Sequence, residues 1–591
     1  MIPSRITFAL AIALTAGCAG NKPNGSGGEN GGGKGVVIMP ADPLLAVDGA
    51  SAATLDFKVY RDGHDVTATA VLAVDNTALG TFSGARFSSV PGVAGRTTVR
   101  ASVGSDLAST SLTLKTTTVV IAPGAPADSA SRFGGAADAS HAPAIAYPPD
   151  GALIPPNLNE LEVQFSDSGN TLFEVGFSGD AIDLRIYTTC NALPGGCGLT
   201  PDEATWKLLS QAARGQALTV TVRGTSKAGG SVGSAPPQTL TFADEDMEGG
   251  LYYWGAGAGG IYRYDFGRRG QKAEEFYTPK QAPDTMCVGC HALSRNGKHI
   301  AVGLNAPTPA PTLRLLDVAT RKTFFDQGGG FGGGSNYEAL TPDGQKVLTT
   351  ETGGLTIHDA QTGKVIGATL ANANMPDVSP DGTRVVFARD AAGCQFGFCM
   401  TLTVMSGALY TVPFTGVGFG APKALVTTGG NNYYPSYSPD GQFVVFNRSK
   451  SASYDAADAR VMAVSTTSGG AIDLQSSNTL PGNSWPKWAP FIHHFQGSTI
   501  MWVTFSSRRA IGLRGGTTAQ LWMVPLDAAK LSAGQDPGFP PVWLPFQDPA
   551  TGNHIAQWVE KVERAPCSQI DNSGCMQGEM CENGVCVPKI M

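Results

Sequence analysis

The most reactive side chains of this sequence stand together in the segment Cys287-Val288-Gly289-Cys290-His291. Two cysteines three residues apart, followed at once by a histidine, form the Cys-x-x-Cys-His pattern that attaches c-type haem. In that chemistry the thiols of Cys287 and Cys290 add to the two vinyl groups of one porphyrin, and the imidazole of His291 becomes the proximal ligand of the iron. The segment therefore predicts one covalently bound haem c.

Other chemistry uses the same two cysteines without needing the histidine. They could form a short-loop disulfide, a redox dithiol or half of a zinc site, although no second Cys-x-x-Cys or close pair of histidines in the sequence completes a zinc site. A sixth iron ligand could come from Met375 or His554, or that position could stay open. Because no spacing points to a substrate acid or base, we expect electron transfer or redox sensing rather than an enzyme.

The element that must position this segment is an internal repeat. Three eight-residue segments share one frame: Tyr337-Glu338-Ala339-Leu340-Thr341-Pro342-Asp343-Gly344, Met375-Pro376-Asp377-Val378-Ser379-Pro380-Asp381-Gly382 and Tyr434-Pro435-Ser436-Tyr437-Ser438-Pro439-Asp440-Gly441. Each is followed by a short apolar strand. Proline presets φ at the first corner of a turn and glycine accepts a positive φ, so each segment predicts a strand and a hairpin turn. Such units every forty to sixty residues, roughly, are typical of a β-propeller.

The cysteine segment fits the same frame, since Cys290 to Gly297 aligns with the three repeats. His291 then stands where the other units have Glu338, Pro376 and Pro435. The first strand of a propeller blade lines the central channel, so we expect the haem at one mouth of that channel. Met375 occupies the position of Cys290 in another blade, which is why it is one choice for the distal ligand.

The repeats resemble the WD-repeat-like units of TolB-type propellers, and this resemblance covers residues 249–562. A degenerate unit begins at Trp485, and the run Asn553–Trp558, which contains His554, is expected to complete a partial blade formed by residues 251–277. We therefore expect six blades, with seven as the alternative. The resemblance implies a second possible function, in which a haem-free propeller binds protein partners through its upper face.

The N-terminal residues are typical of an exported lipoprotein. An apolar run from Ile6 to Leu14 is followed by Leu14-Thr15-Ala16-Gly17-Cys18, which resembles a bacterial lipobox. We expect residues 1–18 to act as a signal peptide and Cys18 to carry the lipid anchor. Ala19 stands where the inner-membrane retention signal has Asp, so the resemblance implies the outer membrane, on its periplasmic or its outer face.

The remaining regions also read as β structure or as linkers. Residues 19–35 form a Gly-rich tether, and residues 119–145 form a second linker rich in Ala, Gly, Ser and Pro. Short alternating runs in residues 36–118 and 146–248 predict two β-sandwiches, which resemble immunoglobulin-like and fibronectin type III modules. The fold class we expect is all-β: two sandwiches, a propeller and a small disulfide-rich tail at residues 563–591.

Cysteine count and charge agree with an exported protein. The chain has 11 cysteines, and beyond Cys18, Cys287 and Cys290 the other eight are expected to form disulfides: Cys190 with Cys197, Cys394 with Cys399, and two bridges of undetermined pairing among Cys567, Cys575, Cys581 and Cys586. The net charge is -7 with no Lys/Arg run, which excludes the electrostatic signature of a nucleic-acid-binding protein. Expected partners are the membrane, through the lipid, and a protein or redox partner.

Overall fold

The computed structural model describes residues 35–591 except 269–271, 306–311, 329–336, 352–353, 391–402, 468, 517, 572–574, 576–578, 583–584 and 589–591. The predictions for the signal peptide, Cys18 and the Cys394–Cys399 bridge therefore lie outside the described residues. Within the described part of the chain, no helix has both the length and the apolar character needed to cross a bilayer.

The described residues of the C-terminal half form six antiparallel sheets around one axis, each with a path of four strands. From the axis outward the blades are β45 (Asn553–Val559), β21 (Gly250–Gly255), β22 (Gly260–Asp265), β23 (Glu274–Tyr277); β24 (Cys287–Leu293), β25 (His299–Asn305), β26 (Leu313–Asp317), β27 (Thr323–Gln327); β28 (Glu338–Leu340), β29 (Lys346–Glu351), β30 (Gly354–Asp359), β31 (Leu370–Ala371); β32 (Asn374–Val378), β33 (Arg384–Asp390), β34 (Gly407–Pro413), β35 (Lys423–Val426); β36 (Asn431–Tyr437), β37 (Phe443–Ser449), β38 (Arg460–Ser465), β39 (Ala471–Asp473); and β40 (Asn483–Trp488), β42 (Ser498–Ser507), β43 (Gln520–Asp527), β44 (Val542–Trp543). In the last blade β41 (His493–Phe495) also pairs with β42, and α2 (Ala528–Ser532) follows β43.

Both ends of this domain close the ring. Strand β45 pairs antiparallel with β21, so that Val559 lies opposite Gly250. The innermost strands contact one another in the cyclic order β24, β28, β32, β36, β40 and β45. This confirms the expected propeller, fixes the blade number at six rather than seven, and removes the open sheet edges that a linear array would expose.

The repeated turn explains why these residues form hairpins. Gly344, Gly382 and Gly441 have φ of 75°, 70° and 69°, where an L side chain would be strained. In the β28 blade the Thr341 hydroxyl donates to the carboxylate of Asp343 at 2.6 Å and accepts a hydrogen bond from the backbone N–H of Lys346. Each Ser/Thr-Pro-Asp-Gly segment therefore ties its own turn to the next strand.

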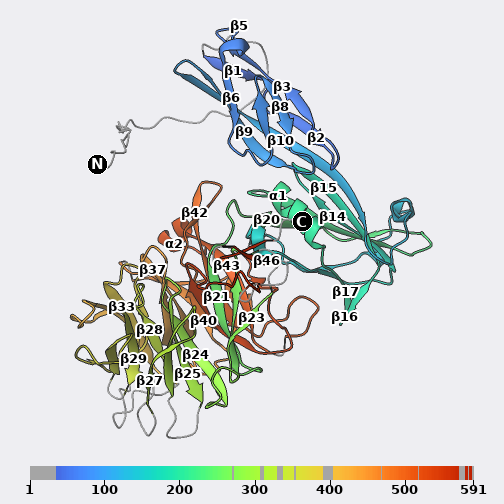
Figure 1. The fold of residues 1–591 in the computed structure, drawn as a ribbon. Coiled ribbons are helices and arrows are strands. Elements are labelled where there is room, and N and C mark those ends of the chain that lie inside the picture. The colour runs from blue at the N-terminus through green and yellow to red at the C-terminus, as the bar shows by residue number, and fades with distance from the viewer. Residues whose placement is uncertain are drawn as a thin grey trace.

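The N-terminal half forms two β-modules that share one sheet (Figure 1). The first module contains β1 (Val36–Met39), β4 (Lys58–Arg61) and β5 (His64–Asp65), then β3 (Thr54–Asp56), β8 (Arg86–Ser89) and β7 (Gly80–Ser83), and β2 (Leu44–Val47), β10 (Asp106–Ile121), β9 (Gly95–Val103) and β6 (Val71–Val74). The second contains β15 (Ile182–Thr188), β14 (Leu172–Ser178), β18 (Ala217–Thr225), β19 (Gly233–Ser234), β20 (Gln238–Phe242) and β12 (Ala152–Ile154), and β11 (Ile145–Tyr147), β13 (Val163–Phe165), β17 (Gly196–Leu199) and β16 (Asn191–Leu193).

Strand β10 joins the two modules. It pairs with β9 of the first module, and its end, Thr116–Ile121, pairs in parallel with Ile182–Tyr187 of β15. The strand therefore runs through residue 118, where we expected the first module to end, and the expected linker holds the last residues of β10 and the short 3-10 helices η2 (Ser129–Phe133) and η3 (Ala139–His141). Continuous backbone hydrogen bonding makes the two modules one arm.

One helix interrupts the second module. Helix α1 (Glu203–Ala212) begins after Asp202, whose carboxylate accepts a hydrogen bond from the backbone N–H of Thr205 at 2.8 Å. Alternating strand patterns did not predict this helix, although Asp202 after Pro201 is a typical N-cap. The three remaining described 3-10 turns are η1 (Thr67–Thr69), η4 (Pro156–Leu158) and η6 (Ser477–Thr479).

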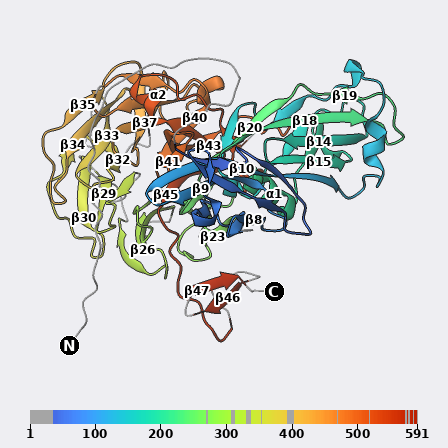
Figure 2. The ribbon, with the colours of Figure 1, turned by 90° about the horizontal axis from the view of Figure 1, so that it is seen from above.

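The second module packs beside the propeller (Figure 2). An ion pair joins Arg514 to Glu162 at 2.9 Å, and the phenol oxygen of Tyr147 accepts a hydrogen bond from the backbone N–H of Trp543 at 3.0 Å. One apolar core runs from the first module through the second into the β40 and β45 blades. A wide cavity of about 630 Å³ lies at this contact, between α1 and the loop at Phe546. The propeller is therefore fixed to the arm by both polar and apolar contacts.

Disulfides hold two small parts of the chain. Cys190 is bonded to Cys197, as expected, beside the β16–β17 hairpin. In the tail Cys567 is bonded to Cys581 and Cys575 to Cys586, around the hairpin of β46 (Glu579–Glu582) and β47 (Val585–Pro588). The tail therefore has two bridges, and the structure supplies the pairing that the sequence left open.

Candidate functional site

The cysteine segment forms β24, the innermost strand of its blade. Its register against β25 shifts between Val288 and His291, which is the signature of a β-bulge. Equivalent shifts occur in β32, β36, β40 and the pair of β45 with β21. A bulge re-aims the side chain that it contains, so these inner strands turn one residue each toward the axis.

Six equivalent residues meet at this level of the channel, one from each blade, and we call them the channel ring: Cys290, Tyr337, Met375, Tyr434, Trp485 and Ile555. Four of them have a left-handed backbone, with φ of 52° at Met375, 51° at Tyr434, 52° at Trp485 and 54° at Ile555. For residues other than glycine this conformation costs roughly 1 kcal/mol or more each. The fold maintains that cost at the same place in four blades, which is typical of a site rather than of ordinary packing.

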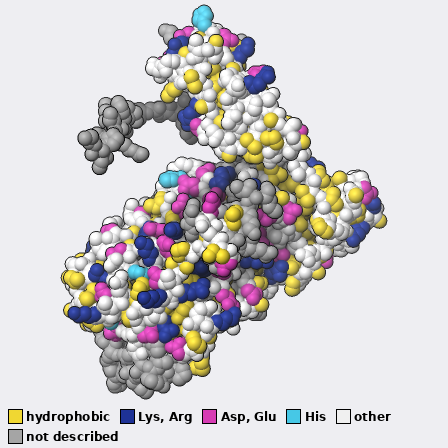
Figure 3. Space-filling view, viewed as in Figure 1, with side chains coloured by type: hydrophobic (Ala, Val, Ile, Leu, Met, Phe, Trp, Pro, Cys, Tyr) yellow, Lys and Arg dark blue, Asp and Glu magenta, His cyan; other side chains and the backbone are white. Residues whose placement is uncertain are grey.

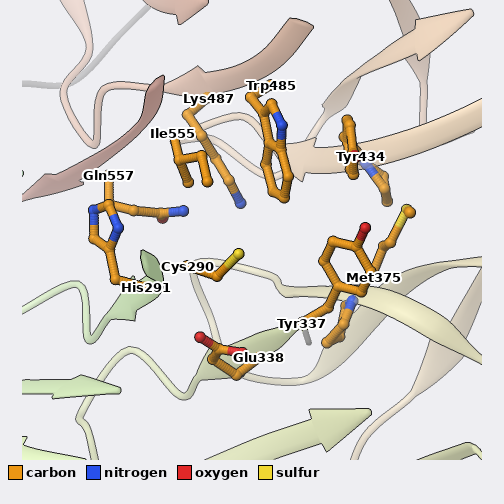
Figure 4. Close-up of a pocket in the computed structure, with 12 residues that line it drawn as sticks. Cys290, His291, Tyr337, Glu338, Met375, Tyr434, Trp485, Lys487, Ile555 and Gln557 are labelled. Atoms are coloured by element: carbon orange, nitrogen blue, oxygen red, sulfur yellow. The ribbon is translucent and has the colours of Figure 1, made fainter. Parts of the chain in front are cut away.

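Aromatic side chains fill one side of the ring (Figure 4). The rings of Tyr434 and Trp485 stack with centroids 3.8 Å apart, and Tyr337 lies 5.8 Å from Trp485 and 6.0 Å from Tyr434. Together with Cys290 and Glu338 they surround a small cavity of about 30 Å³. A cavity of this size holds about two water-sized groups.

Two buried polar side chains face this cavity without satisfied hydrogen bonds. Both carboxyl oxygens of Glu338, a residue only 9% exposed, lack a hydrogen-bond partner among the described residues. The ring nitrogens of His291, which is 3% exposed, make no hydrogen bond of good geometry with the described residues, although the backbone carbonyls of Tyr252 and Gly289 lie close to the ring. Burial raises the pKa of Glu338 to about 8. Burial lowers the pKa of His291 to about 4, although the backbone carbonyls of Tyr252 and Gly289 oppose this, so the imidazole is neutral at physiological pH.

The two thiols of the segment lie in different surroundings. Cys290 lines the cavity, where burial, and next the nearby carboxyl of Glu338, raise the pKa of its thiol to about 12. Cys287 lies against the β21–β22 hairpin, close to Gly259, and burial raises the pKa of its thiol as well. Both cysteines are free, whereas the other described cysteines form disulfides.

A charged pair lies one step deeper in the channel. The ammonium of Lys487 donates to the carboxylate of Asp377 at 3.2 Å, and the other oxygen of Asp377 accepts a hydrogen bond from the backbone N–H of Tyr437 at 2.7 Å. Because Lys487 also lines the cavity, this cation is already neutralised where it faces the ring. The carboxyl of Glu338 has no such counter-charge among the described residues.

The expected distal haem ligands are placed differently. Met375 belongs to the channel ring and lines the cavity together with Cys290 and His291. His554 is not among the described residues that line it, because its neighbour Ile555 takes the inward position on β45. The imidazole of His554 instead lies 5.9 Å from the indole of Trp254, between strands of its own blade. Of the two candidates only Met375 shares the cavity with His291.

The geometry does not fit a c-type haem. That group needs both thiols at one edge of the porphyrin and an imidazole nitrogen at the iron. Here Cys290 faces the cavity while Cys287 faces a neighbouring hairpin, and both nitrogens of His291 are buried. The cavity of about 30 Å³ is also far smaller than the 300 Å³ or more, roughly, of pockets for ligands of drug size. In this fold the segment has no space for a macrocycle.

Glu338 is the residue that the sequence interpretation missed. In the alignment of repeats Glu338 occupies the position of His291 in the next unit, but no role was predicted for it. The signal was the residue type itself, since a carboxylate replaces the proline of two other units at a position that lines the channel.

Comparison with known proteins gives no family for this chain. No protein-family model matches it, and no curated protein matches it. Among solved structures it is similar to a TolB-type protein from Agrobacterium tumefaciens, with 16% identity, a TM-score of 0.32, and coverage of 51% of this chain and 89% of that one. TolB from Acinetobacter baumannii has 18% identity, a TM-score of 0.35, and coverage of 52% and 66%.

A third similar structure is the dihydro-haem d1 dehydrogenase NirN in complex with DHE. It has 14% identity and a TM-score of 0.28, with coverage of 48% of this chain and 54% of that one. These likenesses concern the fold alone, and the six blades rest on the strand pairing described above.

Proposed function

We propose that this protein is an exported, lipid-anchored scaffold whose propeller binds a protein partner at the end of the channel where the ring lies. The observation that carries the proposal is the channel ring itself, with its repeated left-handed backbone and with the carboxyl of Glu338, for which the described part of the chain offers no hydrogen-bond partner. Strain and an unsatisfied buried group both lower stability, and folded proteins retain them chiefly where a site requires them.

Exposed apolar side chains also lie at the end of the propeller that carries the channel ring. Connections at the end of the propeller where the inner strands begin carry four of them: Met286 at 69% exposure, Met405 at 63%, Tyr454 at 65% and Leu480 at 53%. Large apolar residues with exposed surface are enriched where partners bind. On the face of the protein shown in Figure 3, acidic and basic side chains are intermingled, so the described residues of that face form no patch of a single charge.

The arm supports the anchoring part of the proposal. Its far end, with β1 and β5, stands away from the propeller in Figure 1, and the tether and Cys18 precede β1 in the sequence. Lipid on Cys18 would place the propeller at the end of a continuous sheet. Metabolic labelling with palmitate tests this: the full chain is expected to incorporate label and Cys18→Ala is not, whereas equal labelling of both contradicts it.

Site-specific photo-crosslinking in the cell that makes the protein tests partner binding. A photoreactive residue at Met405 is expected to give a discrete crosslinked product. The same residue at Val417, which is equally exposed at 63% but lies in the β34–β35 connection at the opposite end of the propeller, is expected to give none. Crosslinks from both positions alike, or none from Met405, would contradict the proposal.

A second candidate function is electron transfer or redox sensing through a covalent haem c. The observation that favours it is that Cys287 and Cys290 stay free while the other described cysteines are paired. It requires a different arrangement of β24, because the described one has no room for the group. Haem staining of the purified exported protein, and visible spectra before and after reduction, distinguish the two functions.

A further inference from the structure

The cavity inside the channel ring has the size, walls and charge of a site for one small cation. It lies just inside the channel, since β32, β36 and β40 begin at Asn374, Asn431 and Asn483, within three residues of their ring positions. Its volume of about 30 Å³ admits a group the size of one or two waters. An alkylammonium head is of that size, whereas a guanidinium or a larger organic group is not.

The walls favour an organic cation over water. Tyr337, Tyr434 and Trp485 present aromatic surface on one side, which attracts cations through the charge distribution of the rings. The opposite side carries the carboxyl of Glu338 with both oxygens unpaired among the described residues. An ammonium group that reached this carboxyl would form a charge-assisted hydrogen bond and satisfy a buried group that now has no partner.

The other polar groups at the cavity do not oppose a cation. Lys487 is held by Asp377 at 3.2 Å, Cys290 carries a neutral thiol, and His291 is neutral. The remaining titratable side chains at this level are the phenols of Tyr337 and Tyr434, which are also neutral because burial raises their pKa values. Glu338 is the one acidic side chain among the described lining residues, and no counter-charge stands beside it there. Because burial raises its pKa to about 8, its carboxyl is largely protonated at neutral pH in the empty site and releases its proton to solvent when a cation binds beside it.

We propose that the channel ring binds the head of a primary alkylammonium group, with the carboxylate of Glu338 as its counter-ion and the aromatic side chains of Tyr337, Tyr434 and Trp485 beside the head. This rests on the proposed function and gives the partner its chemistry: a lysine side chain inserted into the channel, or a free alkylamine. A metal ion is a poorer occupant, because Cys290, His291 and Glu338 do not converge as a ligand set among the described residues.

Calorimetric titration of the full-length protein with n-butylamine hydrochloride tests the site. We expect saturable millimolar binding, no binding of the uncharged n-butanol, and a loss of at least about tenfold in affinity for Glu338→Gln. Glu275→Gln, which changes an exposed carboxylate of β23 paired with Lys280, is the matched control and is expected to bind normally. Equal binding by wild type and Glu338→Gln, or no binding by wild type, overturns the proposal.

Two further measurements complete the test. If Glu338→Gln does not fold, Glu338→Asp keeps the charge and is expected to retain the preference for butylamine over butanol; loss of that preference in a folded Glu338→Asp variant counts against the site. The lysine peptide Ac-Ala-Lys-Ala-NH₂ and butylamine are compared to separate the two sources: tighter binding of the peptide assigns a protein partner, and equal or weaker binding a free amine. Crosslinking from Met405 that persists while butylamine fails to bind refutes the ammonium site and leaves the scaffold function standing.

Discussion

The reactivity of the channel thiols gives the sharpest quantitative prediction. Burial raises the pKa of Cys290 to about 12, which at neutral pH lowers its thiolate fraction roughly a thousandfold relative to an ordinary cysteine. The thiolate that does form is more basic and therefore roughly 15- to 30-fold more nucleophilic in thiol–disulfide exchange. The net expectation is a reaction roughly 30- to 60-fold slower than that of a free cysteine, before any steric protection is counted.

The assay is exchange of the native protein with 4,4′-dithiodipyridine at neutral pH, with the modified cysteines located by peptide mass spectrometry. Both cysteines are half-buried, but only the thiol of Cys290 lies beside the carboxyl of Glu338, so Cys287 is expected to react first and Cys290 second. After denaturation both should react at the rate of ordinary thiols. If Cys290 in the folded protein reacts as fast as free cysteine, the surroundings described for its thiol are wrong. If neither residue reacts even when denatured, the thiols are already covalently modified.

Three other predictions follow from the described contacts. Glu351 and His358 form an ion pair at 2.6 Å. Burial opposes both charges, but the pair lowers the pKa of Glu351 to about 2 and raises that of His358, so the pair stabilises the fold fully between about pH 4.5 and 6.5. Thermal melting should show this contribution lost toward pH 2 and weakened above about pH 6.5, and the difference in melting temperature between wild type and Glu351→Gln should shrink at both ends; a difference that does not change with pH would contradict the assignment. Replacing Cys190 and Cys197 by serine removes a short bridge and should cost about 2 kcal/mol, measured by urea unfolding; an unchanged midpoint would show that the bridge does not stabilise the second module. Thr116→Pro deletes the backbone N–H that donates to the carbonyl of Ala181 at 3.0 Å, where β10 begins to pair with β15, and should loosen the arm in small-angle scattering. An unaltered profile would mean that the shared sheet does not hold the modules together.

The propeller could be predicted from the sequence because its information is local and repeated. Each Ser/Thr-Pro-Asp-Gly segment stabilises its own turn, through the hydrogen bonds of a side chain such as Thr341 and the positive φ of a glycine such as Gly344. The spacing of these turns then predicts four-stranded units. Even the closing strand was visible, since residues 553–558 had the pattern of a missing inner strand.

The bulges, the shared sheet and α1 could not be predicted, for three different reasons. A left-handed backbone at Tyr434 or Trp485 is unfavourable for those residue types, so only the surrounding sheet imposes it. The pairing of β10 with β15 joins segments that are far apart in the sequence, and no residue pattern in either segment indicates which strand it will pair with. The helix that begins after Asp202 was not predicted, because the alternating polar and apolar residues of the surrounding strands led us to interpret the whole region as a β-sandwich.

The spacing of the Cys-x-x-Cys-His motif did not predict the directions in which its three side chains point. Its spacing predicted that Cys287, Cys290 and His291 act on one group, and this rests on a compact turn or helix. The repeat frame placed the segment on an inner strand, as the structure has it, but the bulge in that strand could not be predicted, and successive side chains leave the backbone in different directions and reach different neighbours. The motif therefore marked the right place in the molecule, the channel, while the haem that it predicted stays a proposal.

The most direct test is the mass of the tryptic peptide 281–295, which contains Cys287 and Cys290, from protein exported in a host that supplies the cytochrome maturation machinery. After reduction and alkylation under denaturing conditions, a haem-free propeller scaffold requires two alkylated cysteines on this peptide and no added macrocycle. A porphyrin bound through both sulfur atoms would contradict the account and restore the redox function.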